Sequence, residues 1–393
     1  PNPQSPIPNP QSPIPIILKG NYIVKNILNN IIYNMFKFFK RNAKKPNINK
    51  SMHRPLELIN IDNNAYMNSV IQCLFHLLKF RNYFKQNIFS EDEQPLSYEL
   101  SNIFKHLSFV NGGKSFGLNV LKNIMGEIDD SFLGSNGADS VDFLSYLFSI
   151  LIAEQTCYIG VDSSMMSVLD TSDKEKVFEY CQYRIGEDTA LVYVMNYIEI
   201  EYNCKVKAKE KIRKYHRPFY SFENRCYLEF DLEDWFEKYG KIKIELSECF
   251  NYFFKEEREK SDEFCPECDN NTKCESKINL YKTPEYLILV LNHKKNRNLT
   301  INYHEYINIK AFTNDKECYY RLVGVVLYNN NSLKLIHYIA CCLNSELNNE
   351  EQFYLFDDNN VYKFSFIKIK DLSYTPYILF YEKHSPFLNG NNS

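Results

Sequence analysis

The chain has 393 residues, a formal net charge of −3 at pH 7, 44% hydrophobic residues and 15% aromatic residues. This composition describes a globular chain with enough apolar residues for a sizeable core, and it excludes an intrinsically disordered protein. The small net charge gives no electrostatic reason to expect a nucleic-acid partner, and no run of about 18 apolar residues occurs, so a membrane span is not expected.

The cysteine pattern indicates the cellular compartment. Twelve cysteines are spread over the chain without the dense, regular spacing of a secreted disulfide scaffold. A reducing, intracellular compartment, either cytoplasm or nucleus, is therefore expected. The chain begins at Pro1 and not at Met, which is compatible with a fragment of a longer protein.

The first 50 residues contain two segments of different character. Residues 1–20 are a predicted disordered, proline-rich tail that opens with two copies of P-N-P-Q-S-P-I. Residues 21–50 are predicted to form an amphipathic basic helix, over 21–45, and a linker, because apolar residues recur at three- and four-residue spacing before a lysine-rich end. This helix either packs on the domain that follows or docks on a membrane surface or a protein partner.

The remaining pattern changes from helical to strand-rich, which predicts an α+β fold. One helix is expected to run from the loop near residue 65 to residue 84, with others at 96–107, 118–128 and 140–153. Strands are expected at 192–201, 226–232, 286–291, 322–328, 335–341, 353–356 and 376–381.

Residues 58–74 read as a tight polar loop that runs into the N-terminus of a buried helix. Free backbone N–H groups and the positive end of the helix dipole make such a junction suitable for thiolates and oxyanions. Asn60 and Asn63 flank the helix start, where their amides either donate to an oxyanion or form ordinary turns and caps. Ala65 stands at the junction and has no reactive group.

His337 lies in a strand-like run, and Asp357 and Asp358 follow about twenty residues later, after the next such run. A carboxylate at the end of a neighbouring strand can fix the tautomer of an imidazole base. The same residues are also compatible with a structural histidine and a turn.

Cys265 and Cys268, in C-P-E-C, have the spacing of half a tetrahedral zinc site. Cys204 is the upstream candidate for the other half, but its partner position holds Lys207, whose ammonium group cannot ligate zinc. The site is therefore either empty or completed by Cys226, His216 or Cys181. Whether the chain holds a structural zinc ion is left open, and no cofactor is expected to be required.

Several motifs occur together. Residues 57–74 read E-L-I-N-I-D-N-N-A-Y-M-N-S-V-I-Q-C-L, and later stretches read N-G-A-D-S-V-D-F-L-S-Y-L-F, F-C-P-E-C, K-T-P-E-Y-L-I-L-V-L, H-Y-I-A, F-D-D-N-N-V and P-Y-I-L-F-Y-E-K. The first of these resembles the box G-L-x-N-L-G-N-T-C-Y-M-N-S-x-L-Q-C-L of the ubiquitin-specific protease family of cysteine peptidases. The others resemble its Q-D-x-x-E-F-L helix, its fingers region, its histidine and acid box and its closing strand.

This resemblance implies a papain-like catalytic domain over 54–383, followed by a tail at 384–393. A helical thumb is expected at 55–160, β fingers derived from a zinc ribbon at 190–300, and a β-sheet palm at 301–383. Ubiquitin is the implied partner, with its C-terminal tail in the cleft between thumb and palm.

The resemblance also assigns roles to individual residues. Ala65 occupies the nucleophile position, His337 that of the general base, Asp357 that of the orienting acid with Asp358 as an assistant, and Asn60 that of the oxyanion hole. Substrate contacts are expected from Tyr66, Asn68, Gln72, Asp139, Ile336 and Tyr338.

The chain also departs from the family pattern around the cleft. Loss of a triad nucleophile costs on the order of a million-fold in turnover, and Cys73 lies about 12 Å along the helix from the junction. Asp62 and Ile336 replace glycines, Asn64 replaces a threonine, and Ala138 replaces a glutamine. Asp62 is expected to place a negative charge beside an oxyanion, which is the wrong sign for catalysis.

Three functions remain open from the sequence. The departures favour a pseudo-deubiquitinase that binds ubiquitin without turnover. Retention of His337, Asp357 and Asn60 is compatible with a thiol-dependent deubiquitinase inactivated by a Cys-to-Ala substitution. The third alternative is a ubiquitin-independent scaffold that docks a partner through the helix at 21–45.

Overall fold

The fold is described from a computed structural model of the chain. The described residues are 55–108, 116–135, 137–156, 170–207, 215–255, 258–293, 299–316, 318–329, 336–345, 351–370, 372 and 374–385. The tail expected at 1–20, the helix expected at 21–45 and most of the tail expected at 384–393 lie outside these residues.

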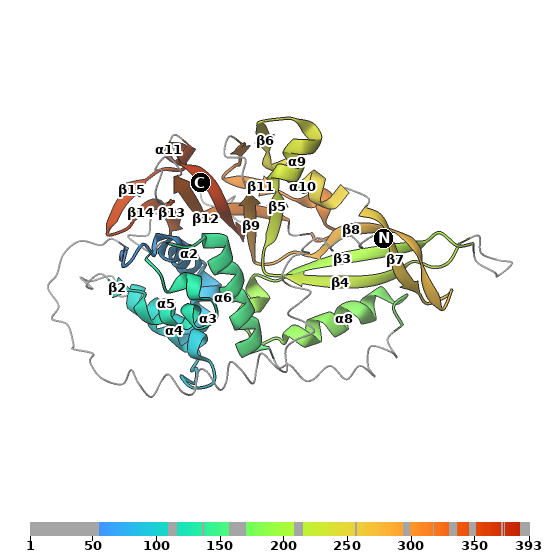
Figure 1. The fold of residues 1–393 in the computed structure, drawn as a ribbon, viewed down its shortest axis with the longest axis horizontal. Helices are drawn as coiled ribbons and strands as arrows, with labels where there is room; N and C mark the ends of the chain where they lie inside the picture. The colour runs from blue at the N-terminus through green and yellow to red at the C-terminus, as the bar shows by residue number, and fades with distance from the viewer. Residues whose placement is uncertain are drawn as a thin grey trace, which may run out of the picture.

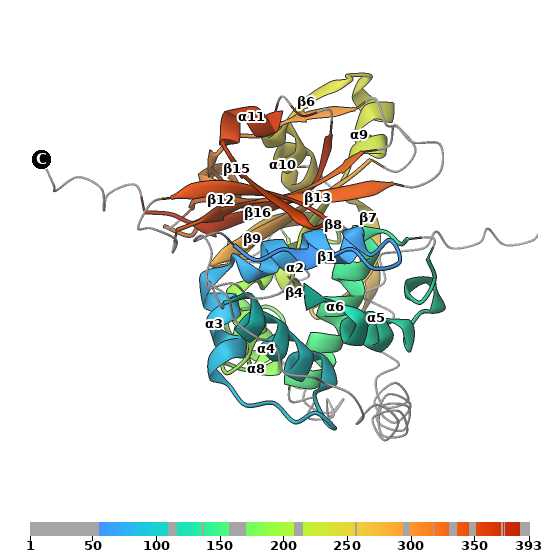
Figure 2. The same cartoon turned by 90° about the vertical axis from the view of Figure 1, so that its left-hand side faces the viewer.

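The first part of the domain is helical and contains α2 (Ala65–Phe75), α3 (Leu78–Gln86), α4 (Pro95–Leu107), α5 (Asn119–Gly126) and α6 (Ser140–Gln155). Every residue of α2 is buried, because this helix packs against α6 on one side and against the large β-sheet on the other. Figure 2 shows α2 between the sheet and the other helices. The short strands β1 (Leu58–Ile59) and β2 (Phe116–Gly117) pair in parallel beside it.

The large sheet has eight strands, in the order β15-β14-β13-β12-β16-β9-β5, with β11 also paired to β12. All its neighbours are antiparallel except β5 and β9, which run in parallel. The strands are β5 (Leu228–Asp231), β9 (Tyr286–Asn292), β11 (Tyr306–Asn308), β12 (Tyr319–Asn329), β13 (His337–Asn344), β14 (Gln352–Asp357), β15 (Asn360–Phe364) and β16 (Thr375–Lys383). Apolar runs in β9, β12, β13 and β16 are buried, and they form the core together with α2.

A second sheet, in the order β4-β3-β8-β7, extends away from helices α2–α6 (Figure 1). It consists of β3 (Asn196–Cys204), β4 (Phe219–Arg225), β7 (Arg258–Cys265) and β8 (Asn270–Lys282). The helix α8 (Lys174–Ile185) lies along it, and Phe178 of α8 packs on the rings of Tyr197, Phe222 and Tyr281. The helix α10 (Leu246–Lys255) also contacts β8.

The remaining elements connect the two sheets or cover the large sheet. They are α9 (Leu232–Tyr239), the parallel pair β6 (Lys243–Glu245) and β10 (Thr300–Asn302), α11 (Phe366–Lys370), and the short 3₁₀ turns η1 (Asp130–Phe132), η2 (Ala190–Tyr193) and η3 (Lys310–Phe312). None of the helices in the described ranges is both long and apolar enough to cross a membrane. The predicted α+β fold is confirmed.

Two predictions differ from the structure. The single helix expected to reach residue 84 is broken, since α2 ends at Phe75 and α3 begins at Leu78. At the break His76 Nδ1 bonds to the Gln72 carbonyl at 2.8 Å, and Leu77 turns to an extended ψ of 95° while remaining fully buried. The boundary expected at residue 300 also differs, because β5 and β9 belong to the large sheet.

Candidate functional site

The loop before α2 contains two consecutive residues in the left-handed region. Asp62 has φ +51° and Asn63 has φ +60°. Asparagine and aspartate tolerate this region better than other side chains, and glycine adopts it freely. The structure therefore explains why the family box has a glycine at the position of Asp62.

Hydrogen bonds fix this loop on several sides. Asn64 Oδ1 accepts the Ile61 N–H at 2.9 Å, and Asn63 Nδ2 donates to the Ser135 carbonyl. Lys122 of α5 donates from Nζ to the Asp62 carbonyl at 3.3 Å. The loop delivers Ala65, 6% exposed, as the first residue of α2, so the expected loop-to-helix junction is present.

The structure brings His337 and Asp357 together. His337 begins β13, Asp357 ends β14, and His337 Nε2 donates to Asp357 Oδ1 at 2.8 Å. This hydrogen bond raises the pKa of His337 above its ordinary value, although partial burial opposes the shift. The bond fixes the ring orientation and leaves Nδ1 as the nitrogen at which a proton can be taken up.

A small pocket lies between the helix junction and the residues next to this pair. It has a volume of about 10 Å³ and is lined by Leu58, Ala65, Asn68, Ser69, Gln72, Tyr338, Phe356 and Asp358. Ala65 of α2 thus shares one pocket with the residues that follow His337 and Asp357. Asp358 has φ +49°, and its Oδ1 is buried without a hydrogen-bond partner among the described residues.

Asn60 lies where the loop approaches the acid box. Its backbone N–H donates to Asn359 Oδ1 at 3.4 Å. Its own Oδ1 is buried and has no hydrogen-bond partner in the described part of the chain. The oxyanion-hole role of Asn60 stays a prediction.

Three residues expected to contact substrate make contacts within the domain, and their contact with substrate stays a prediction. Tyr66 is 2% exposed and packs on Phe132 and Phe143, and burial raises its pKa to about 12. Asn68 Nδ2 donates to the Ile59 carbonyl at 3.1 Å, and Gln72 Nε2 donates to the Leu56 carbonyl at 2.9 Å. Tyr66 is therefore a core residue, while the amide N–H groups of Asn68 and Gln72 hold residues 56–59 against α2.

Asp139 connects the helical part with the large sheet. Its carboxylate caps α6 through the Val141 N–H at 2.7 Å and also accepts the hydroxyls of Tyr338 and Tyr377, each at 3.0 Å. Burial, together with the Asp139 charge, raises the pKa of both tyrosines. The sequence analysis did not single out Tyr377, because only the pairing of β16 with β12 brings it beside Tyr338.

Ile336 is 43% exposed and directly precedes His337. Unlike Tyr66, it presents an accessible apolar side chain at the edge of the site. Its expected contact with substrate stays a prediction.

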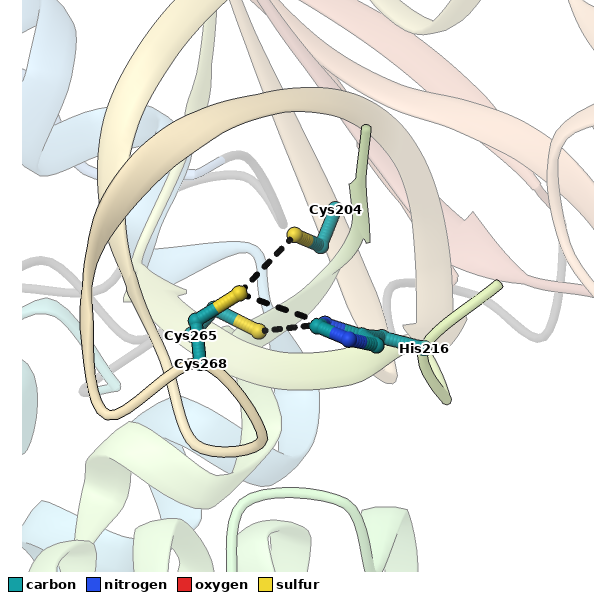
Figure 3. Close-up of side chains that lie close together, drawn as sticks. All are labelled: Cys204, His216, Cys265 and Cys268. Carbon is teal, nitrogen blue, oxygen red and sulfur yellow. Dashed lines mark hydrogen bonds between the residues drawn. The ribbon is translucent and has the colours of Figure 1, made fainter. Parts of the chain in front are cut away.

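A cysteine and histidine cluster lies in the second sheet. Cys204, His216, Cys265 and Cys268 each offer one ligand atom, and all these atoms lie within 4.8 Å of one another (Figure 3). The distance between the sulfurs of Cys204 and Cys268 is 3.7 Å, and His216 Nδ1 lies 3.4 Å from the Cys265 sulfur and 3.3 Å from that of Cys268. Of the three residues left open as the fourth ligand, His216 lies in this cluster, and Cys226 and Cys181 do not.

The donor set fits zinc. Bond lengths of about 2.3 Å for Zn–S and about 2.0 Å for Zn–N in a tetrahedron require ligand atoms roughly 3.5–3.8 Å apart, close to the distances observed. Burial opposes ionisation, but hydrogen bonds from Thr272, the Val206 backbone and the neighbouring thiols lower the pKa of Cys204 to about 7. Burial and the neighbouring thiols raise the pKa of Cys268 to about 12, so the hydrogen bonds in this cluster favour the thiolate on Cys204 and the thiol on Cys268.

Comparison with known proteins identifies relatives of the whole domain. The chain is 22% identical over 349 residues to ubiquitin carboxyl-terminal hydrolase 2 of Bos taurus, which covers 84% of this chain and 55% of that protein. It is 23% identical over 346 residues to ubiquitin carboxyl-terminal hydrolase Usp2 of Drosophila melanogaster, covering 83% and 34% respectively. The chain thus spans about half or less of the length of these curated relatives.

Solved structures share the fold. The Ubp8/Sgf11/Sus1/Sgf73 deubiquitinating module of SAGA bound to monoubiquitin matches with a TM-score of 0.60 at 19% identity, over 93% of this chain and 76% of that chain. The same module bound to ubiquitin aldehyde matches with a TM-score of 0.57 at 20% identity, over 90% and 75%. Residues 56–381 match the family model described as ubiquitin carboxyl-terminal hydrolase. Since this match covers most of the sequence, the chain belongs to the ubiquitin carboxyl-terminal hydrolase family.

Proposed function

We propose that this domain binds ubiquitin, with the C-terminal tail of ubiquitin in the cleft between the helical part and the large sheet, and that it acts as a pseudo-deubiquitinase. Family membership supports the first half of the proposal. So do the two structural neighbours whose modules are bound to monoubiquitin and to ubiquitin aldehyde.

The observation that carries the second half is the position of Ala65. This residue begins α2 and shares a pocket with Tyr338 and Asp358, the residues that directly follow the hydrogen-bonded His337 and Asp357. A methyl group cannot form a thioester, so the covalent route is closed. Cys73 is not a substitute, because its sulfur is fully buried 3.7 Å from that of Cys342.

A second candidate is a thiol-dependent deubiquitinase that cleaves isopeptide bonds at the ubiquitin C-terminus and is inactivated here by a Cys-to-Ala substitution. The 2.8 Å hydrogen bond between His337 and Asp357 favours it, since it orients a base for which Ala65 provides no proton donor. Adduct formation between the A65C variant and a ubiquitin C-terminal electrophile tests this candidate.

Isothermal titration calorimetry of the full chain with ubiquitin tests the binding proposal. We expect saturable binding that is weakened at least tenfold by I336R, which adds bulk at the exposed residue beside His337, and weakened similarly by deletion of the ubiquitin tail. I367R is the matched control. Ile367 lies on α11 and is 76% exposed. The helix α11 follows the end of β15, which pairs with β14 at Phe353. This is the opposite end of β14 from Asp357.

The alternatives make different predictions in the same titration. If no saturable heat appears at high micromolar ubiquitin, ubiquitin is removed as the ligand. The remaining candidate is then a scaffold whose partner docks through residues 21–45. A capture experiment with and without that segment would identify such a partner by its loss.

We also propose a structural zinc ion held by Cys204, His216, Cys265 and Cys268. The distances among these ligand atoms support the proposal. When bound, the ion would join β3, the hairpin of β7 and β8, and the segment carrying His216.

A further inference from the structure

Lys122 is a buried lysine beside the loop that leads to Ala65. Its side chain is only 7% exposed, although lysine is rarely buried without a partner. It extends from α5 to the loop, where Nζ lies 3.3 Å from the Asp62 carbonyl oxygen and 4.0 Å from Asp62 Oδ2. One ammonium group therefore faces both the backbone and the carboxylate of the same residue.

The backbone contact acts on the strained part of the loop. Asp62 and Asn63 are both left-handed, and neither is glycine. Such a conformation persists only where surrounding contacts hold it. The Lys122 ammonium donates to the carbonyl oxygen of the peptide that joins these two residues, and the Ser135 carbonyl accepts a hydrogen bond from the Asn63 side chain.

The charge contact acts on the electrostatics of the junction. The N-terminus of α2 favours an anion, and a bare carboxylate three residues earlier would oppose one. The Asp62 side chain is 67% exposed, so solvent screens part of its charge, and the Lys122 ammonium 4.0 Å away is placed to offset the rest.

We propose that Lys122 is a positioning residue for this junction: its ammonium group, placed by the hydrogen bond to the Asp62 carbonyl, offsets the Asp62 charge, so that position 65 retains a potential suited to a thiolate or an oxyanion. This inference rests on the proposed assignment of position 65 as the former nucleophile position. It does not depend on whether ubiquitin binds.

A cysteine introduced by A65C serves as the probe of the local potential. We would measure its alkylation by iodoacetamide between pH 5 and 10, a reaction in which the thiolate displaces iodide from carbon. Peptide mass spectrometry of residues 55–79 follows the label, and the parent chain provides the blank for Cys73 in the same peptide. His337, Asp357 and Asp358 also lie near the probe, but they are identical in every variant compared.

Four proteins are compared: A65C alone, A65C with K122M, A65C with D62N, and A65C with both. K122M keeps a long side chain and removes the charge, and D62N keeps a residue that tolerates φ +51°. We expect K122M to raise the midpoint of alkylation by about 0.5–1 pH unit, which slows labelling at neutral pH about three- to tenfold. D62N alone should shift the midpoint in the opposite direction.

The double substitution decides between an electrostatic and a merely structural role. If Lys122 acts through Asp62, adding D62N to the K122M protein returns the labelling rate at neutral pH to within twofold of the rate of A65C alone. An unchanged midpoint in K122M, or the same deficit with and without D62N, overturns the proposal. Circular dichroism melts of all four proteins establish that each is folded, and none of these readouts requires ubiquitin.

Discussion

His337 Nε2 and Asp357 Oδ1 are 2.8 Å apart, joined across the neighbouring strands β13 and β14. The register places Ala340 opposite Phe356, so the start of one strand meets the end of the next and the two side chains converge at the same edge of the sheet. The residues that follow this pair, Tyr338 and Asp358, line the same small pocket as Ala65 at the start of α2.

The first prediction concerns the titration of His337. Because the bond to Asp357 raises the folded-state pKa, D357N should lower the pKa of His337 toward or below its ordinary value. The stabilisation that this pair gives the fold is fully present below the pKa that His337 has in the unfolded chain. It is lost as the pH rises through the higher pKa that His337 has in the folded chain. NMR of histidine-labelled protein between pH 5 and 9 measures the shift, with the resonance assigned by its absence in H337Q. An identical pKa in D357N would contradict the role of Asp357.

The second prediction concerns latent activity. The A65C variant, offered a ubiquitin C-terminal electrophile, should form a covalent adduct, because the junction and the base are still in place. Adding H337A should slow adduct formation by about 10²-fold or more, the usual contribution of a general base. Intact-mass measurement over time gives the rates. A folded A65C variant that forms no adduct would exclude the inactivated-deubiquitinase alternative.

The active-site box could be predicted from sequence because it is local. Residues 65–75 carry a helical apolar period and a polar loop ahead of it, and a loop-to-helix junction formed where it was expected. The surroundings of Tyr66 and Gln72 could not be predicted in the same way. Their position in the box suggested substrate contact, but whether a side chain on a buried helix faces a cleft or the core depends on partners such as Phe143 and Leu56.

The second sheet was harder to predict. Its hairpin of β7 and β8 contains R-E-K-S-D-E-F-C and N-N-T-K, which lack the apolar alternation typical of strands. The hairpin forms because β8 pairs with β3, which places Cys204 opposite Cys274 and brings Cys265 into the same cluster. The fourth donor, His216, could be named only as one of three alternatives, since its selection depends on this long-range pairing.

The third prediction tests the metal cluster. H216A and C268S should each abolish stoichiometric zinc, measured by elemental analysis of protein purified without chelator, and should lower the melting temperature by about 5–10 °C. C274A is the matched control. Cys274 is fully buried in the same apolar cluster but is not among the four converging ligands, so zinc should be retained. Absence of zinc from the parent protein, even after refolding with the metal, would remove the proposal.

The fourth prediction concerns Glu154, which joins two helices in the helical part. Its carboxylate, from α6, accepts the N–H groups of Leu96 and Ser97 at the start of α4, both at 2.8 Å, and the Ser97 hydroxyl at 2.7 Å. Burial raises its pKa from 4.5 to about 7, although the hydrogen bonds with Ser97 and Leu96 oppose the shift. The folded state therefore binds this proton more tightly than the unfolded state.

The sign of the resulting pH dependence follows. A raised folded-state pKa contributes stability that is fully present below pH 4.5 and is lost as pH rises through about 7. From the size of the shift, the free energy of unfolding should fall by roughly 3 kcal/mol over this interval through Glu154 alone. E154Q cannot titrate at this position. The unfolding free energy of the parent chain minus that of E154Q should therefore fall by this amount between pH 4.5 and 7. Urea unfolding at several pH values measures it, and a difference that stays constant with pH would show that folding does not raise the pKa of Glu154.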